Sequence, residues 1–169
     1  KNMSKKLNLK TPLIDSISKS NIEQINRALN LIISKNKKKI GFLGLTFKAD
    51  TDDIRGNPVL LIINNLLSKN HDVKIFDNLV NSSNVLQINE SYRKEIFDLI
   101  NRENLKDKIQ NISNLFFPLE KVLEQDIIVI SNRDKSLIEY LRRLPEEKII
   151  IDLQHIFEAS DFSANYESL

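Results

Sequence analysis

The sequence predicts an α/β fold, a Rossmann-like parallel sheet that is flanked by helices and preceded by a long helix. Two observations lead to this prediction. Short, continuously apolar runs, typical of strands covered on both faces, alternate with segments of helical periodicity. Ahead of the first run lies an amphipathic segment that is too long to bury its whole apolar stripe on one small domain. We therefore expect a linker or dimerisation helix in residues 1–37 and a Rossmann-like domain in residues 38–169.

The long helix is predicted to begin at Pro12, because apolar residues recur from there to Ile33 at spacings of three and four. A stripe of this length corresponds to about five or six helical turns. The lysines between residues 35 and 39 suit the carboxyl end of a helix, where the macrodipole favours positive charge.

The remaining elements follow in order along the chain. Four apolar runs predict parallel strands, at 40–45, 73–77, 126–130 and 148–152. Residues 115–117 are a further, shorter strand candidate. Helical periodicity predicts helices at 57–67, 92–109, 118–123 and 136–144. The tail from residue 154 to residue 169 is polar, so we expect it to be loosely held.

Composition excludes several classes of function. The 169 residues suit one domain with a modest appendage. A net charge of +2 gives no strong field for nucleic acid, and the absence of cysteine excludes disulfides, thiolate metal sites and a cysteine nucleophile within this chain. No run approaches the roughly 18 apolar residues of a membrane span, and the N-terminus has no signal-peptide core. We therefore expect a cytoplasmic protein without nucleic-acid or membrane partners.

The stretch from residue 39 to residue 58, KIGFLGLTFKADTDDIRGNP, organises the domain. It begins as a strand, continues as a charged loop and ends where Asn57 and Pro58 suit the N-cap and the first position of a helix. Ligands of α/β domains bind where strands end and helices begin. We therefore expect the binding site in this loop, with Phe47, Lys48 and Arg55 as its candidate residues.

Composition alone leaves two interpretations of these loop residues open. Lys48 and Arg55 either pair with the neighbouring aspartates and hold the shape of the loop, or face an anionic ligand that arginine can bind bidentately. Phe47 is either a cap on the core or a surface on which a base stacks.

Other candidate sites have less support. Gly41 and Gly44 fall short of the three-glycine dinucleotide fingerprint, and a loop of roughly a dozen residues separates them from the helix. Asp77 is therefore predicted to be a turn residue rather than a ribose ligand. His71 and His155 have no second metal ligand at a suitable spacing, and no serine has histidine and aspartate partners, so we predict neither a metal site nor a hydrolase triad.

The loop closely resembles the C-terminal-domain signature of the UDP-glucose/GDP-mannose dehydrogenase family, the nucleotide-sugar 6-dehydrogenases. Residues 44–58 are GLTFKADTDDIRGNP, and the family pattern is roughly G-L-x-F-K-x-x-T-D-D-x-R-x-S-P. Strands that end at Asp77, Asn132 and Asp152 also match, so the resemblance covers essentially the whole chain. Two positions depart from it: Gly56 replaces an acidic residue, and Asn57 replaces the serine.

The resemblance implies a protein in which an N-terminal Rossmann domain binds NAD, a long central helix forms the homodimer and a C-terminal Rossmann-like domain binds the nucleotide sugar. Such an enzyme oxidises the C6 alcohol of the sugar to a carboxylate in two NAD-dependent steps, through a cysteine thiohemiacetal and thioester. This chain has neither the cysteine nor the glycine fingerprint. It therefore resembles the central helix plus the C-terminal domain, which would contribute no catalytic residue, leave NAD to the missing domain and not catalyse the reaction alone.

Position by position, the resemblance also implies roles for the loop residues. Phe47 would pack on or near the nucleotide sugar, and Lys48 would hydrogen-bond the sugar and its developing carboxylate. Arg55 would hold the loop or reach the ligand. Asp52 and Asp53 would orient these cations rather than act as bases.

Two features favour the GDP-mannose 6-dehydrogenase branch, which makes GDP-mannuronate. Ser20, Asn21 and Gln24 resemble the R-S-N-x-x-Q helix of that branch, and Gln154 stands where the UDP-glucose branch usually has arginine. The alternatives are UDP-glucose or UDP-N-acetylhexosamine 6-dehydrogenase and, from other classes, a non-catalytic nucleotide-binding module or a helix-mediated scaffold.

Overall fold

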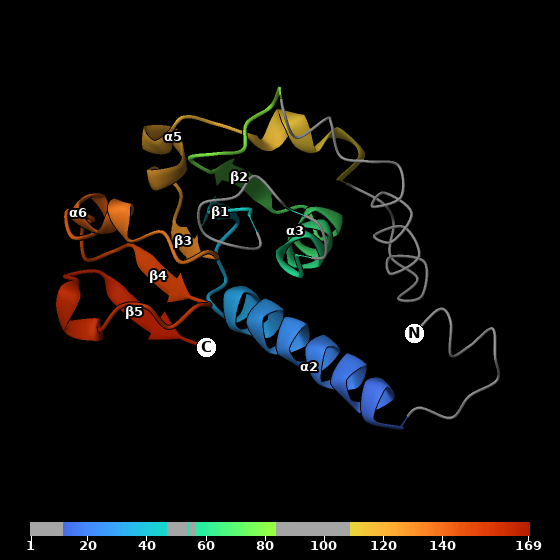
Figure 1. Ribbon diagram of the computed structural model, residues 1–169. Coiled ribbons are helices and arrows are strands. Elements are labelled where there is room, and N and C mark those ends of the chain that lie inside the picture. Colours follow the sequence, from blue (N-terminus) through green and yellow to red (C-terminus); the bar gives the residue numbers. More distant parts are fainter. Residues whose placement is uncertain (1–11, 47–53, 55–56, 84–108) are drawn as a thin grey trace.

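A computed structural model describes residues 12–46, 54, 57–83 and 109–169. Within these residues, five parallel strands form one sheet in the spatial order β2-β1-β3-β4-β5 (Figure 1). The strands are β1 (Lys39–Leu43), β2 (Asp72–Phe76), β3 (Ile127–Ile130), β4 (Ile149–Asp152) and β5 (Asn165–Ser168). The predicted α/β fold with a parallel sheet is confirmed, and the first four strands lie where apolar runs predicted them.

Helices cover both faces of the sheet. Successive residues of a strand point to opposite sides, so each strand contributes apolar side chains to a core on either face. Ile40 and Phe42 of β1 face a core that is shared with α2 and α3. Leu43 of β1 and Ile128 of β3 face a second core beneath α5 and α6. The helices are α2 (Pro12–Ser34), α3 (Val59–Ser68), α5 (Leu119–Leu123) and α6 (Ile138–Leu141), and the 3-10 turns are η2 (Ile109–Leu115), η3 (Lys135–Leu137) and η4 (Ala159–Asp161).

The long helix α2 is confirmed, and its carboxyl half packs against the domain (Figure 1). Ala28, Leu29 and Ile32 join the core with α3, and each is less than 9% exposed. In the amino half, Ile17 is 54% exposed and Ile22 is 36% exposed. The helix therefore carries apolar surface that this domain does not cover.

The predicted basic end of this helix differs in the structure. α2 ends at Ser34 without a basic residue in its last turn, and Asn36 follows with a left-handed φ of 54°. Lys35 instead forms an ion pair with Glu167 of β5. The lysine thus joins the end of the helix to the edge strand of the sheet.

Two predicted elements are wrong in extent or type. Residues 136–144 are not one helix, because η3 precedes α6 and Asp134 accepts a hydrogen bond from Ser136 N at 2.8 Å at the start of that turn. The strand candidate at 115–117 is the end of η2 followed by a single parallel bridge between Phe116 and Ile75. An apolar run of three residues has no periodicity that could distinguish these cases. The helix predicted at 92–109 lies outside the described residues, apart from Ile109.

The prediction of a loosely held tail is also wrong. After β4 the chain continues through η4 into β5, which pairs in parallel with β4 from Asn165 to Ser168. Phe157 and Ala164 are buried in the second core. The tail is therefore part of the sheet and of its hydrophobic core.

Asp152 is the reason that this polar tail is ordered. Its side chain is fully buried; Oδ1 accepts from Gln154 N at 2.8 Å, and Oδ2 accepts from Ile156 N at 2.8 Å and Phe157 N at 3.2 Å. The Tyr166 hydroxyl of β5 lies 3.0 Å from the same Oδ2. Burial, together with the hydrogen bond to this carboxylate, raises the pKa of Tyr166 and keeps its hydroxyl a donor.

Replacing Asp152 by asparagine should loosen the whole tail. The amide keeps one acceptor oxygen but turns an NH2 group toward backbone donors, so we expect a loss of about 2–4 kcal/mol in the free energy of unfolding. Urea denaturation measures this loss, and hydrogen exchange at Gln154, Ile156 and Phe157 locates it. Glu147→Gln, which changes an exposed acid just before β4, is the matched control. Unchanged stability and unchanged exchange in the tail would contradict the role of Asp152.

Candidate functional site

The carboxyl ends of the strands bring polar side chains to one edge of the sheet. Gly44 follows β1, Asp77 follows β2, Ser131 follows β3, and Asp152 ends β4. The chain leaves β1 toward α3 on one face, but it leaves the neighbouring strand β3 toward α6 on the other. Doubly wound sheets bind ligands outside such a point of divergence. This edge, between β1 and β3, is therefore the candidate site.

Gly44 is required where the chain leaves β1. Its φ is +91°, a left-handed conformation, and its N–H donates to Phe76 O at 2.8 Å. A Cβ at this position would lie 2.1 Å from Cγ of Asn132 on the neighbouring loop. Only glycine allows the two loops on either side of the divergence to come this close.

Asp77 joins the loops that follow β1 and β2. It is 9% exposed, and its Oδ2 accepts from Leu45 N at 2.6 Å and from Thr46 N at 3.1 Å. Its Oδ1 accepts from Leu79 N at 2.8 Å and from Val80 N at 3.0 Å. The prediction of a turn residue is confirmed, but the sequence did not reveal that Asp77 also holds the start of the β1 loop. An acid directly after an apolar strand was the available signal.

Asn57 holds the other end of this loop. Its Oδ1 accepts from Val59 N at 2.9 Å, as the predicted cap would, and Pro58 has the helical φ and ψ of −63° and −20°, although the regular helix α3 begins one residue later, at Val59. Its Nδ2 donates to Leu45 O at 2.8 Å, so the residue before the helix is tied to the residue after the strand. The sequence predicted the cap but not this second contact.

Ser131 and Asn132 complete the edge from the side of β3. Ser131 Oγ lies 3.1 Å from Leu43 O and also reaches Gly44 O, and it donates to one of them at a time. Asn132 Nδ2 donates to Thr46 Oγ1 at 3.3 Å. These contacts fix the distance between the ends of β1 and β3.

The predicted binding residues Phe47, Lys48 and Arg55 lie outside the described residues. Their neighbours along the chain are buried. Thr46 is 2% exposed, Ile54 is 5% exposed and packs in the core, and Asn57 is 6% exposed. The three candidate residues are thus flanked along the chain by residues that the sheet edge and the core hold.

The histidines occupy structural positions. His71 Nδ1 lies 3.1 Å from Leu66 O, and burial lowers the pKa of His71 below its ordinary value. His155 contacts the Ser168 hydroxyl. Within 12–46, 57–83 and 109–169, no three His, Asp or Glu side chains come together as metal ligands would. In the same part of the chain, no helix combines the length and apolarity that crossing a membrane requires.

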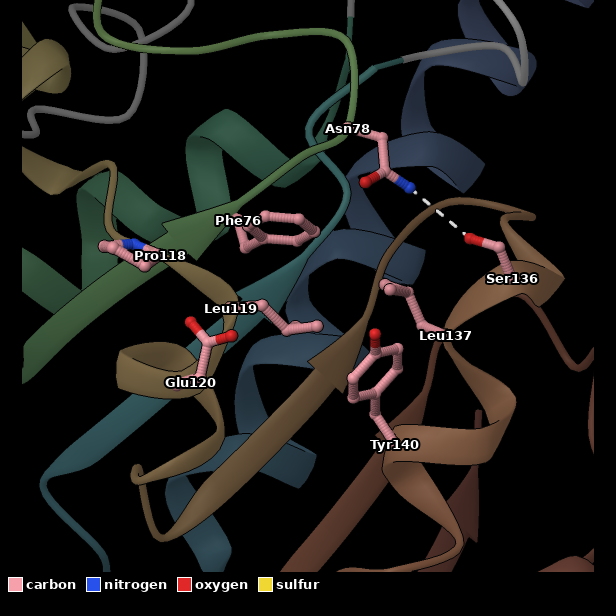
Figure 2. A pocket seen from close by; sticks show the side chains of 8 residues that line it. All are labelled: Phe76, Asn78, Pro118, Leu119, Glu120, Ser136, Leu137 and Tyr140. Atoms are coloured by element: carbon pink, nitrogen blue, oxygen red, sulfur yellow. Dashed lines mark hydrogen bonds between the residues drawn. The ribbon is translucent and has the colours of Figure 1, made fainter.

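A pocket of about 500 Å³ opens on the α5 and α6 face of the same edge (Figure 2). Three segments form its wall: the end of β2 with the residues just after it, the start of α5, and η3 with α6. Its lining residues are Phe76, Asn78, Pro118, Leu119, Glu120, Ser136, Leu137 and Tyr140. Sequence analysis did not single out any of these residues, because they come from segments that only the fold brings together.

Comparison with known proteins identifies relatives over most of the chain. The GDP-mannose 6-dehydrogenase of Pseudomonas aeruginosa is 31% identical over 149 residues, which are 87% of this chain and 31% of that protein. The UDP-glucose 6-dehydrogenase of Rickettsia prowazekii is 32% identical over 127 residues, which are 72% of this chain and 24% of that protein. The chain thus spans less than a third of the length of either relative.

The fold and a family model agree with these relatives. The crystal structure of a ternary complex of GDP-mannose dehydrogenase from Pseudomonas aeruginosa aligns with a TM-score of 0.68 and 27% identity, covering 98% of this chain and 36% of that one. Residues 41–159 match the family model described as the UDP binding domain of the UDP-glucose/GDP-mannose dehydrogenase family. This match includes the loop from residue 44 to residue 58 whose signature suggested the resemblance. The chain therefore belongs to the UDP-glucose/GDP-mannose dehydrogenase family.

Proposed function

We propose that this chain supplies the sugar-nucleotide site of an NAD-dependent nucleotide-sugar 6-dehydrogenase, which oxidises the C6 alcohol of GDP-mannose in two steps to give GDP-mannuronate. The observation that carries the proposal is the anchored loop at the divergence of β1 and β3. The candidate binding residues of its signature lie between Thr46 and Asn57 in sequence, both of which are buried at the carboxyl edge of the sheet. The two ends of the loop are thus held by hydrogen bonds, Thr46 N to Asp77 and Asn57 Nδ2 to Leu45 O.

Within this proposal, Phe47, Lys48 and Arg55 contact or support the ligand. Phe47 packs on or near the nucleotide sugar. Lys48 hydrogen-bonds the sugar and stabilises the carboxylate charge that develops at C6, because a fixed cation lowers the free energy of a state in which negative charge forms. Arg55 holds the loop or binds the ligand, and its guanidinium has the geometry to bind a phosphate bidentately.

The preference for GDP-mannose over UDP-glucose rests on the relatives and on Gln154. Matches to proteins named GDP-mannose 6-dehydrogenase extend over 147–149 residues at 31–34% identity, whereas the Rickettsia prowazekii UDP-glucose 6-dehydrogenase match extends over 127 residues. Gln154 lies at the candidate edge, where its N–H donates to Asp152 Oδ1 at 2.8 Å and its Nε2 donates to Ser131 O at 3.2 Å. A neutral amide thus stands at the position where the UDP-glucose branch usually has an arginine.

We infer that NAD binds to another part of the intact protein. The β1 to α3 connection of this chain does not fit a dinucleotide, because the side chain of Asn57 already caps α3 and Pro58 removes one N–H from its first turn. Gly41 serves packing instead of phosphate binding, since a Cβ there would lie 2.7 Å from Val122 Cγ1 of α5. Without an NAD site or a cysteine of its own, the chain is proposed to be inactive alone.

The same proposal assigns the amino half of α2 to a homodimer interface. Ile17 and Ile22 are exposed on a helix whose other half is packed in the domain. A second copy of this helix would bury that apolar surface, and burial of such side chains drives association. The cellular location proposed for the protein is the cytoplasm.

Calorimetric titration with GDP-mannose, UDP-glucose and NAD tests the proposed site. We expect the chain to bind GDP-mannose in preference to UDP-glucose, and Lys48→Ala to weaken that binding about tenfold or more, because a charge-assisted hydrogen bond is lost. Lys69→Ala is the control, since Lys69 follows α3 at the opposite edge of the sheet. A GDP-mannose affinity that Lys48→Ala leaves unchanged would contradict the role of Lys48. Binding of NAD would contradict the assignment of the domain.

Asp77→Asn should weaken the same binding from a distance. The amide cannot accept from all four N–H groups, so the start of the loop loses its anchor. We expect about a tenfold loss in GDP-mannose affinity and about 1–3 kcal/mol of stability. Calorimetry and urea denaturation measure the two effects. Asp72→Asn, an exposed acid at the other end of β2, should change neither. Full affinity in the Asp77 variant would show that the loop does not depend on this carboxylate.

Analytical ultracentrifugation tests the interface on α2. We expect a dimer for the chain and a monomer for the Ile17→Lys, Ile22→Lys double variant, because lysine places charge in an apolar interface. Asn30→Lys, at an exposed position on the packed half of the helix, should remain dimeric. A monomeric wild-type chain would contradict an interface made by α2 alone.

A further inference from the structure

The pocket on the α5 and α6 face has no role in the proposed sugar-nucleotide site. We propose that it binds a planar amidinium or guanidinium group, the positively charged end of a small ligand or of an arginine side chain. The proposal rests on the ring faces, the charge and the hydrogen-bonding groups of its wall, all of which lie in the described part of the chain.

Two aromatic rings provide flat surfaces for a planar group. Phe76, the last residue of β2, lies at the back of the pocket, and Tyr140 of α6 stands at its side with its hydroxyl directed toward Leu137 (Figure 2). Tyr140 is 49% exposed, so much of its ring remains open to a ligand. The faces of aromatic rings carry negative charge density and attract guanidinium groups.

The polar groups of the wall are acceptors and hydroxyls rather than cations. Apart from the tyrosine, Glu120 is the one ionisable residue on the wall. Its side chain is exposed, and it forms no ion pair with another described residue. A carboxylate matches the two parallel N–H groups of an amidinium or guanidinium bidentately. A phosphate or a carboxylate ligand would be repelled by Glu120, because no lysine or arginine lines the pocket to offset that charge.

Asn78 presents an acceptor of fixed orientation. Its Nδ2 donates to Asp134 Oδ2 and lies 3.4 Å from Ser136 Oγ, and its oxygen points away from these partners toward Phe76 (Figure 2). Asp134 is itself held, because its Oδ1 accepts from Ser136 N at 2.8 Å. The amide oxygen is therefore preorganised to accept from a donor in the pocket.

The size of the pocket limits the ligand that it can hold. A volume of about 500 Å³ exceeds that of a guanidinium alone and lies within the range of small-molecule pockets. The ligand should therefore carry an apolar or aromatic body behind its cationic end.

Three probes of one shape test the charge preference. Benzamidine, benzamide and benzoate share a phenyl ring and differ in charge, so we titrate each into the ¹⁵N-labelled chain and follow the backbone amides around the pocket. We expect benzamidine to shift Phe76, Asn78 and Ser136, benzamide to bind about fivefold more weakly, and benzoate not to bind. Equal affinities for benzamidine and benzamide, or binding of benzoate, would overturn the proposal.

Two exposed positions locate the interaction. Glu120→Gln should weaken benzamidine about two- to fivefold and leave benzamide unchanged, because the variant removes charge and keeps shape. Tyr140→Leu should weaken both probes, because it removes the ring. Glu147→Gln is the matched control for charge. If the Glu120→Gln variant has native spectra and binds benzamidine as tightly as the wild type does, the assignment of Glu120 is overturned.

The source of the cation is distinguished with N-acetyl-arginine amide and its neutral counterpart, N-acetyl-citrulline amide. If N-acetyl-arginine amide binds at least as well as benzamidine, the pocket is assigned to a protein side chain. If benzamidine binds and N-acetyl-arginine amide does not, the pocket is assigned to a small aromatic cation. Binding of citrulline amide equal to that of arginine amide would overturn the charge argument. Lys48→Ala should leave all of these affinities unchanged, so the test is independent of the proposed sugar-nucleotide site.

Discussion

The carboxylate of Asp77 is the interaction on which the candidate edge of the sheet depends. Its two oxygens accept from four backbone N–H groups, two from the β1 loop, 31 and 32 residues before Asp77 in sequence, and two from the β2 loop directly after it. A carboxylate that is 9% exposed requires such partners, because burial without them is costly. Satisfying all four donors determines how the chain leaves both strands. The path of the chain at Leu45 and Thr46, where the candidate loop begins, therefore depends on one buried acid.

Asp152 provides the same kind of anchor on the other side of the divergence between β1 and β3. It is fully buried and organises the chain after β4, as Asp77 organises the chain after β1 and β2. The central strands β1 and β3 are linked by contacts of Ser131 and Asn132 instead. Asp77 and Asp152 therefore lie on either side of the ends of β1 and β3, which the neutral side chains of Ser131 and Asn132 link. The rigidity of this edge suits a site that binds a ligand without rearrangement.

Sequence periodicity was sufficient for the parts of the fold that depend on local apolar patterns. Runs such as the one that forms β3 predict buried strands, and Asn57 before Pro58 predicts the start of α3. The tail could not be predicted in this way, because β5 depends on the contact of Tyr166 with Asp152, 14 residues earlier, and on no apolar run of its own. For the same reason, the signature loop identified the family, but the second contact of Asn57 and the pocket beside α5 required the fold.

The charge of a wall decides which ligands a site accepts. The pocket beside α5 and α6 carries the acid Glu120 and no lining lysine or arginine. This acid would repel an anionic nucleotide locally, since screening weakens interactions between exposed charges only beyond about 8 Å at physiological ionic strength. The candidate cations Lys48 and Arg55 belong in sequence to the connection between β1 and α3. An anionic and a cationic ligand would thus be distinguished by the charge of the groups around them rather than by pocket size.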